Sequence, residues 1–203
     1  SGGNTALSVS LTAIATLLAV VMTPLNLKVW GGLYPPSAAL LTEVQIQLWE
    51  MVRLVALLLG LPLIAGMAVG YWKPRLAGRI SKYFKGGSLL FFVFLIFIAL
   101  YNNRDIFMDY IGLVFALVFF HNLAAFALGY SSSRLMGLSP KDVKSITIET
   151  GIQNSGLGLI IIFNFFNGQG SMALIAAWWG IWHIISGFAV SQFFAYRTSK
   201  VSI

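Results

Sequence analysis

Glu149 lies in an apolar part of the sequence, among glycines and oxygen-bearing side chains, in the segment SITIETGIQNSGLG at residues 145–158. An ionisable side chain within a membrane span costs about 2.5–3.5 kcal/mol, so it needs a partner or a function. No lysine or arginine occurs within four residues of it. Carboxylate, amide, hydroxyl and carbonyl oxygens bind hard cations such as sodium, whereas transition metals favour thiolates or paired histidines. The segment therefore indicates an oxygen-lined cation site.

Three glycines beside this acid argue against one continuous helix. Gly151, Gly156 and Gly158 each cost about 1 kcal/mol relative to alanine in a helix interior. We expect two half-helices that meet within the membrane, where the unwound backbone offers carbonyl oxygens and Gln153 offers an amide oxygen. The alternative is that Glu149 is protonated or hydrogen-bonded to a neighbouring helix, and that the glycines only permit close packing.

A second set of polar side chains recurs every four residues near the start of the chain: Asn4, Ser8, Thr12 and Thr16. This spacing places the four side chains on one face of a helix. Hydroxyls in membrane helices commonly bond carbonyls of their own helix or pack against a neighbour, so this face alone is typical of a structural role. Beside Glu149 it becomes a candidate source of cation ligands.

Two histidines are the remaining titratable candidates within apolar segments. His121, which precedes Asn122, and His183 occur in no ligand-spacing motif. A lone histidine in a helical bundle is more typical of a hydrogen-bonded packing residue than of a ligand or proton carrier.

The composition requires a lipid environment for these candidates. Of the 203 residues, 58% are hydrophobic and only 9% are charged, and the mean hydropathy is +0.85, so too few polar side chains are available to cover a water-soluble globule. The chain contains no cysteine, which excludes disulfides and thiolate metal sites. The net charge of +7 comes from short basic stretches rather than a continuous basic surface, so we expect no nucleic-acid partner.

Apolar runs of suitable length predict six membrane spans, because about 20 helical residues cross a bilayer core of about 30 Å. Runs such as residues 89–96 do not alternate in polarity, which argues against a β-barrel. The predicted fold class is therefore an all-α membrane protein with six transmembrane segments, of which the fifth is discontinuous. The predicted spans are residues 4–22, 48–71, 88–101, 109–130, 142–166 and 171–196.

The lysines and arginines predict the orientation of these spans. Ten of the 13 basic residues fall between the second and third spans, between the fourth and fifth spans, or in the C-terminal tail, which share one side of the membrane when six spans cross it. Lys28 and Arg104 fall on the opposite side, and Arg53 lies at the end of a span. Because cytoplasmic loops carry the excess of basic residues, both ends of the chain are predicted to be cytoplasmic.

Three sequence blocks together resemble one transporter family. Residues 149–156, ETGIQNSG, resemble the signature of the bile acid:sodium symporter family, in particular its bacterial sodium-dependent organic anion transporters. Residues 3–12, GNTALSVSLT, followed by Thr23 and Pro24, resemble the fifth helix of that family, and residues 182–187, WHIISG, resemble its tenth. The chain thus resembles the fifth to tenth helices of these proteins.

The resemblance implies a ten-helix fold of two inverted five-helix repeats, in which the fourth and ninth helices are broken. Within a single transmembrane domain at 1–203, residues 1–23 would form the last helix of the first repeat, and residues 44–203 would form the second repeat. The chain has no initiator methionine, so we expect it to be truncated at the N-terminus and to need the preceding helices of the same protein as partners.

The resemblance also implies oxygen ligands for two transported sodium ions: Ser8, Thr12 and Glu149 for one ion, and Glu149, Gln153 and the backbone carbonyls of Thr150 and Ile152 for the other. Asn154 and His183 would face the substrate cavity.

These observations predict a sodium-coupled symporter of an organic anion, such as a bile acid, a pantothenate-like acid or an oxo acid, in the bacterial inner membrane. Its partners would be sodium, the anion and the lipid bilayer, and no catalytic residue or enzymatic activity is expected. Two alternatives stay open. One is a proton-coupled carrier or antiporter in which Glu149 titrates, and the other is a non-transporting membrane protein that uses its polar stripe for helix assembly.

Overall fold

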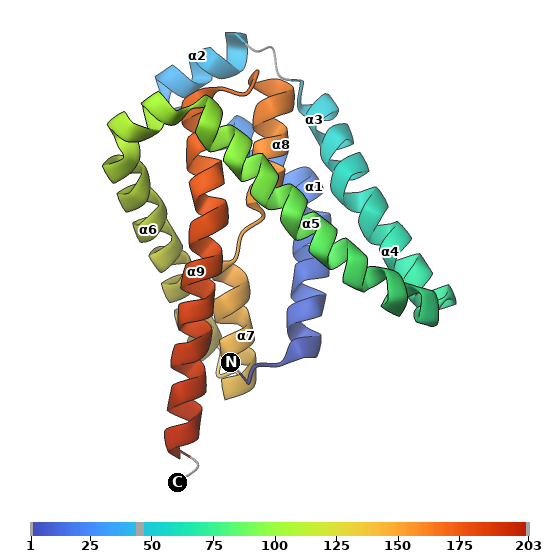
Figure 1. Cartoon of the computed structure of the whole chain (residues 1–203). Helices are drawn as coiled ribbons and strands as arrows, with labels where there is room; N and C mark the ends of the chain where they lie inside the picture. Colours follow the sequence, from blue (N-terminus) through green and yellow to red (C-terminus); the bar gives the residue numbers. More distant parts are fainter. Residues whose placement is uncertain (1, 44–46, 202–203) are drawn as a thin grey trace.

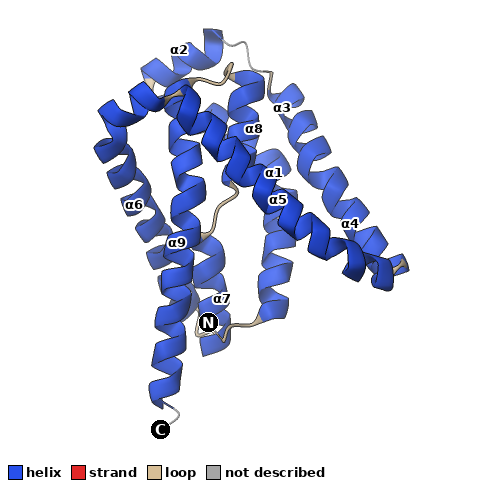
Figure 2. Ribbon diagram, in the orientation of Figure 1, coloured by secondary structure: helices blue, strands red, loops and turns tan. Residues whose placement is uncertain are grey.

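The computed structural model describes residues 2–43 and 47–201, which form helices joined by short connections (Figures 1 and 2). No strand occurs in this described part of the chain, so the prediction of an all-α fold is confirmed. In chain order the elements are α1 (Thr5–Leu33), α2 (Pro35–Glu43), α3 (Leu48–Val55), the π-helical turn η1 (Ala56–Gly60), α4 (Leu61–Trp72), α5 (Pro74–Asn102), α6 (Arg104–Leu135), α7 (Pro140–Gly151), α8 (Ser155–Phe165) and α9 (Gly170–Val201).

Six stretches within residues 2–43 and 47–201 are long and apolar enough to cross a membrane, which confirms the predicted number of spans. Four of them are the single helices α1, α5, α6 and α9. The second span joins α3, η1 and α4, and the fifth joins the half-helices α7 and α8. The short helix α2 lies at one end of the molecule, after α1 (Figure 1).

The first span is longer than predicted. Instead of ending near Met22, α1 continues through Pro24 to Leu33. A proline removes one backbone hydrogen bond, which membrane helices tolerate where neighbouring groups surround the site, and Pro24 is buried. The chain turns at Tyr34, whose extended backbone (φ −105°, ψ 118°) is the conformation favoured before a proline. Pro35, rather than Pro24, therefore marks the end of the helix.

The third span also differs from its predicted bounds. α5 begins at Pro74 rather than at residue 88, because a proline at the first position of a helix has a suitable φ angle and needs no hydrogen-bond acceptor. The basic residues that were expected in a loop at 73–85 therefore lie on a helix from Pro74 onward.

Pro62 accounts for the π-helical turn in the second span. In a regular α-helix its ring would clash with the carbonyl of Leu58, and its nitrogen could donate no hydrogen bond. The wider turn at Ala56–Gly60 lies directly before this proline and relieves the clash. The span therefore stays helical from Leu48 to Trp72.

The apolar half-helix α8 is a centre of packing in the structure. Leu159 and Ile162 pack with buried residues of α5 and α9. On another face, Leu157 and Ile161 pack with buried residues of α3 and with partly buried residues of α1. α8 is thus fixed by four surrounding helices.

α6 and α7 approach each other closely through glycines. A Cβ atom added at Gly129 of α6 would lie 2.8 Å from the Cβ of Thr150, and one added at Gly151 of α7 would overlap the ring of Phe126. Small residues of this kind let two membrane helices pack backbone to backbone.

The start of α1 and the end of α9 lie at the same end of the molecule in Figure 1, where α7 also begins. This placement agrees with six crossings. That this end faces the cytoplasm stays a prediction from the basic residues.

Replacing Gly151 with alanine is expected to destabilise the protein by about 1–3 kcal/mol, because the new methyl group would overlap the Phe126 ring in a close helix interface. Gly112→Ala is the matched control, since it adds the same methyl group to an exposed helical position with no heavy atom within 4 Å. The control should keep or slightly raise stability. Thermal unfolding in detergent, followed by circular dichroism, compares the two, and equal losses would contradict the close interface.

Candidate functional site

The fifth span is broken between Gly151, the last residue of α7, and Ser155, the first residue of α8. Ile152 has extended backbone angles (φ −92°, ψ 113°), and Asn154 has φ −87° and ψ 78°. The predicted discontinuity is confirmed. In Figure 1 the two half-helices lie end to end between α1 and α9.

Side chains satisfy the backbone groups that the break exposes. Asn154 caps α8, because its Oδ1 accepts a hydrogen bond from the backbone N–H of Leu157 at 3.0 Å. At the end of α7, Asn122 Nδ2 donates to the carbonyl oxygen of Gly151 at 2.7 Å, and Ser186 Oγ donates to Asn122 Oδ1 at 2.6 Å. α6 and α9 therefore hold the end of α7 by polar contacts. Sequence reasoning noted Asn122 only as a neighbour of His121 and did not predict this role.

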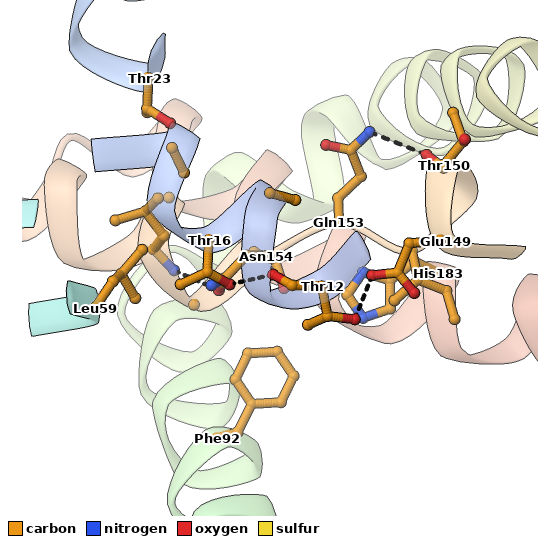
Figure 3. Close-up of a pocket in the computed structure, with 17 residues that line it drawn as sticks. Thr12, Thr16, Thr23, Leu59, Phe92, Glu149, Thr150, Gln153, Asn154 and His183 are labelled. Atoms are coloured by element: carbon orange, nitrogen blue, oxygen red, sulfur yellow. Dashed lines mark hydrogen bonds between the residues drawn. The ribbon is translucent and has the colours of Figure 1, made fainter. Parts of the chain in front are cut away.

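Glu149, in the last turn of α7, is held by two hydroxyl groups of α1. Ser8 Oγ donates to Glu149 Oε2 at 3.1 Å. Thr12 Oγ1 lies 2.5 Å from Glu149 Oε1 (Figure 3). The structure thus brings together three residues that the sequence placed in one predicted ion site. Within the described residues, no basic side chain forms an ion pair with Glu149.

The Thr12 hydroxyl can donate its proton to either of two acceptors. Its Oγ1 lies within hydrogen-bond distance of Glu149 Oε1 and of the backbone oxygen of Ser8, at 3.0 Å. A hydroxyl carries a single proton. When that proton points to Ser8, lone pairs of Thr12 face the carboxylate and become available to a cation. The 2.5 Å separation of the two oxygens is a short hydrogen-bond distance, so they would move apart when both bind a cation.

The outer members of the polar stripe on α1 have other partners. Asn4 Nδ2 donates to Asp142 Oδ1 at 2.8 Å, and the Asn4 carbonyl oxygen accepts from Ser145 Oγ at 2.9 Å. Thr16 Oγ1 donates to the carbonyl oxygen of Thr12 at 2.7 Å. Asn4 therefore joins the beginnings of α1 and α7. Neither Asn4 nor Thr16 hydrogen-bonds to Glu149.

The other predicted ligands lie on the break. Gln153 Nε2 is 3.5 Å from the carbonyl oxygen of Thr150, so the side chain turns toward that residue and forms no hydrogen bond with Glu149 (Figure 3). Ile152 is exposed. His183 of α9 is buried, and its Nδ1 has no hydrogen-bond partner among the described residues. A buried polar atom without a partner indicates a place for water or a ligand.

A cavity of about 770 Å³ opens beside the break, between α1, η1, α5, both half-helices and α9. All the predicted site residues except Ser8 line it: Thr12, Glu149, Thr150, Ile152, Gln153, Asn154 and His183. The structure therefore gathers the predicted ion and substrate residues around one space.

Further side chains line this cavity beside the predicted site residues. Thr16, which the repeat at every fourth residue placed on the same helix face as Thr12, and Thr23 continue the wall formed by α1. Leu59 of η1 and Phe92 of α5 form apolar walls. No local pattern marks these two residues, because their position depends on how the second and third spans pack.

Comparison with known proteins identifies the family of this chain. The profile of the Sodium Bile acid symporter family matches residues 1–110, which is more than half of the 203 residues. The chain belongs to this family. Membership in the sodium bile acid symporter family confirms the resemblance that the three sequence blocks suggested.

Relatives of this chain within the family extend the match across the break. YocS of Bacillus subtilis (strain 168), an uncharacterized sodium-dependent transporter, is 29% identical over 201 residues, covering 98% of this chain and 58% of YocS. The probable sodium/metabolite cotransporter BASS2, chloroplastic, of Oryza sativa subsp. japonica is 30% identical over 167 residues, 82% of this chain and 38% of its own. The human ileal sodium/bile acid cotransporter is 29% identical over 168 residues, 79% of this chain and 44% of its own.

The chain thus spans between 38% and 58% of the length of these three relatives. The family and these relatives are transporters rather than enzymes. Together with the six apolar helices, family membership makes the chain an integral membrane protein.

Replacing Asn122 with alanine is expected to destabilise the protein by about 1–3 kcal/mol, because the buried carbonyl of Gly151 would lose its side-chain partner and the Ser186 hydroxyl would keep only its weaker bond to the His183 carbonyl. Asn164→Ala is the control, since it removes a side-chain hydrogen bond to the carbonyl of Ile160 at an exposed position of α8. The control should change stability by less than about 0.5 kcal/mol. Thermal unfolding in detergent measures both, and a loss of similar size in the control would show that the buried contact is not special.

Proposed function

We propose that this chain forms the sodium-coupling part of a symporter that carries an organic anion across a membrane. The observation that carries the proposal is the contact of Glu149, at the broken span, with the hydroxyl groups of Ser8 and Thr12 on α1. A carboxylate inside a membrane protein with only neutral partners needs a positive charge beside it. The names of the relatives, which describe sodium-dependent transporters and cotransporters, support sodium as that charge.

One proposed sodium site lies between α1 and α7. Ser8 Oγ, Thr12 Oγ1 and the Glu149 carboxylate supply hard oxygen ligands of the kind that alkali and alkaline-earth cations prefer. When the Thr12 proton turns to the Ser8 carbonyl, at 3.0 Å, the lone pairs of Thr12 become available to the ion. A second proposed site uses Glu149, the amide oxygen of Gln153 and the backbone carbonyls of Thr150 and Ile152.

The substrate is proposed to be an organic anion that binds in the cavity at the start of α8. The N-terminus of a helix carries a partial positive charge, which favours a carboxylate there. Asn154 and the unpartnered Nδ1 of His183 line the cavity as polar groups, and Leu59 and Phe92 provide an apolar wall for the organic part of the molecule.

The charge of Glu149 provides a reason for coupling. Both Glu149 and the start of α8 line the same cavity, so an ionised Glu149 repels an incoming carboxylate. A sodium ion on Glu149 removes this repulsion and fixes α7 against α1. Sodium and the anion therefore bind with positive cooperativity, each raising the affinity of the other by the same factor.

Sodium is expected to raise the melting temperature of the purified protein more than potassium does, because a ligand at ten times its dissociation constant stabilises the folded state by about 1.4 kcal/mol. Glu149→Gln should abolish the sodium-specific rise, since it removes the charge and keeps the shape. Glu50→Gln, which neutralises an exposed acid on α3, should retain it. A full sodium-specific rise in the Glu149 variant would rule out the proposed sites.

Thr12→Val is expected to lower the apparent affinity for sodium at least about tenfold, because it keeps the side-chain volume and removes the oxygen ligand. Thr16→Val is the matched control on the same helix face, since Thr16 donates its hydrogen bond to the Thr12 carbonyl. This control should change the affinity for sodium by less than about twofold, which corresponds to a small free-energy change. Sodium titration monitored by thermal shift compares them. Equal effects would favour a packing role for the whole stripe.

Proton coupling is a second candidate, because the short contact of Thr12 Oγ1 with Glu149 at 2.5 Å also suits a protonated acid. Transport of a labelled acid into proteoliposomes distinguishes the two. Uptake that follows a sodium gradient at constant pH supports sodium coupling. Uptake that follows a pH gradient in the absence of sodium supports the proton carrier.

A further inference from the structure

The corner between α4 and α5 has a concentration of positive charge that the proposed transport function does not use. It holds five basic side chains within 13 residues: Lys73, Arg75, Arg79, Lys82 and Lys85. No aspartate or glutamate occurs from residue 51 to residue 104. Among the residues that the structure describes, none of the five forms an ion pair. Like charges on successive helical turns destabilise the helix, so this region favours an anion from outside the chain.

The first half of α5 has one basic face and one apolar face. A helix turns by about 100° per residue, which places its four basic side chains, from Arg75 to Lys85, within one arc of about 120°. A separate arc carries exposed apolar side chains: Leu76, Ile80, Tyr83 and Phe84. A helix with these two faces lies in the interface between lipid headgroups and acyl chains.

The length of the apolar part of α5 supports the same position. Residues 86–101 carry no charge and extend over about 24 Å, which is less than the bilayer core of about 30 Å. α5 also crosses the other helices obliquely (Figure 1), which shortens its reach through the membrane. The basic half of α5 must therefore enter the zone of lipid phosphates.

A hollow of about 560 Å³ lies at this corner, lined by Trp72, Lys73, Pro74, Arg75, Leu76 and Arg79. Arginine guanidinium groups match phosphate oxygens in pairs. Trp72 is 76% exposed, and tryptophan is favoured at the level of lipid headgroups. We infer that this hollow binds the phosphate headgroup of an anionic phospholipid, whose acyl chains lie along the exposed apolar face of α5.

This site is independent of the proposed sodium and substrate sites, because it shares no residue with the cavity at the break. The two are joined by α5, which carries Phe92 into the wall of that cavity. A lipid held at the corner would therefore fix the helix that forms one wall of the cavity.

The test is direct binding of short-chain lipids to the purified protein in detergent, measured by microscale thermophoresis. Dioctanoyl phosphatidylglycerol should bind at least about tenfold more tightly than dioctanoyl phosphatidylcholine, and added salt should reduce this preference. The variant Arg75→Gln/Arg79→Gln/Lys82→Gln should lose affinity for phosphatidylglycerol by on the order of 100-fold, since each cation near the surface contributes about fivefold.

Three controls separate this site from general charge attraction. Lys28→Gln/Arg53→Gln/Arg104→Gln removes the same charge elsewhere and should keep the lipid preference. Arg75→Lys/Arg79→Lys/Lys82→Arg keeps the charge and should bind clearly more tightly than the glutamine variant, although lysine cannot pair with two phosphate oxygens at once, and this retained binding excludes loss of fold as the cause. Glycerol 3-phosphate, which has the headgroup chemistry without acyl chains, should bind far more weakly. Equal affinity for the two lipids, an equal loss in the first control, or binding of glycerol 3-phosphate as tight as that of phosphatidylglycerol would overturn the inference.

Discussion

The partly buried carboxyl group of Glu149 sets the constraints for this part of the protein. The carboxylate of Glu149 has no basic partner among the described residues, and it is stabilised by two hydroxyl groups from a helix more than 130 residues earlier in the chain. Because most of the surrounding side chains are apolar, the acid needs polar contacts, which the hydroxyl groups of α1 and the cavity at the break provide. The contact fixes α7 against α1 and places three oxygen-bearing side chains together in a chain whose surface is mostly apolar.

The two halves of the broken span are held in place by different interactions. α7 is tied by polar contacts, to α1 through Asn4 and Glu149 and to α6 through the carbonyl of Gly151. α8 is held by apolar packing against its neighbours. α7 therefore depends on proton positions as well as on its close packing against α6, whereas α8 depends on apolar packing alone. A change in charge at Glu149 acts first on the half that is tied by hydrogen bonds.

Local chemistry explains which features could be predicted from the sequence. The six spans and the break follow from hydropathy and glycine content. Helical spacing places Ser8 and Thr12 on one face, whereas their meeting with the acid was implied by the family resemblance, and their role as sodium ligands stays a prediction. The ends of α1 and α5 could not be predicted, because Pro24 is accommodated by surrounding groups and Pro74 begins a helix instead of a loop. Leu59 and Phe92 reach the cavity only through long-range packing, which no local pattern encodes.

The π-helical turn at Ala56–Gly60 lies where the second span changes its surroundings. Met51 and Val55, before it, are buried in the core, whereas α4, after it, has no buried residue. A hydrogen bond from residue i to i+5 encloses one residue more than the bond in an α-helix. Each residue of this wider turn therefore rotates the chain by less than the 100° of an α-helix. The turn shifts the faces of α4 relative to those of α3, so one span can pack its first half into the core and present its second half to lipid.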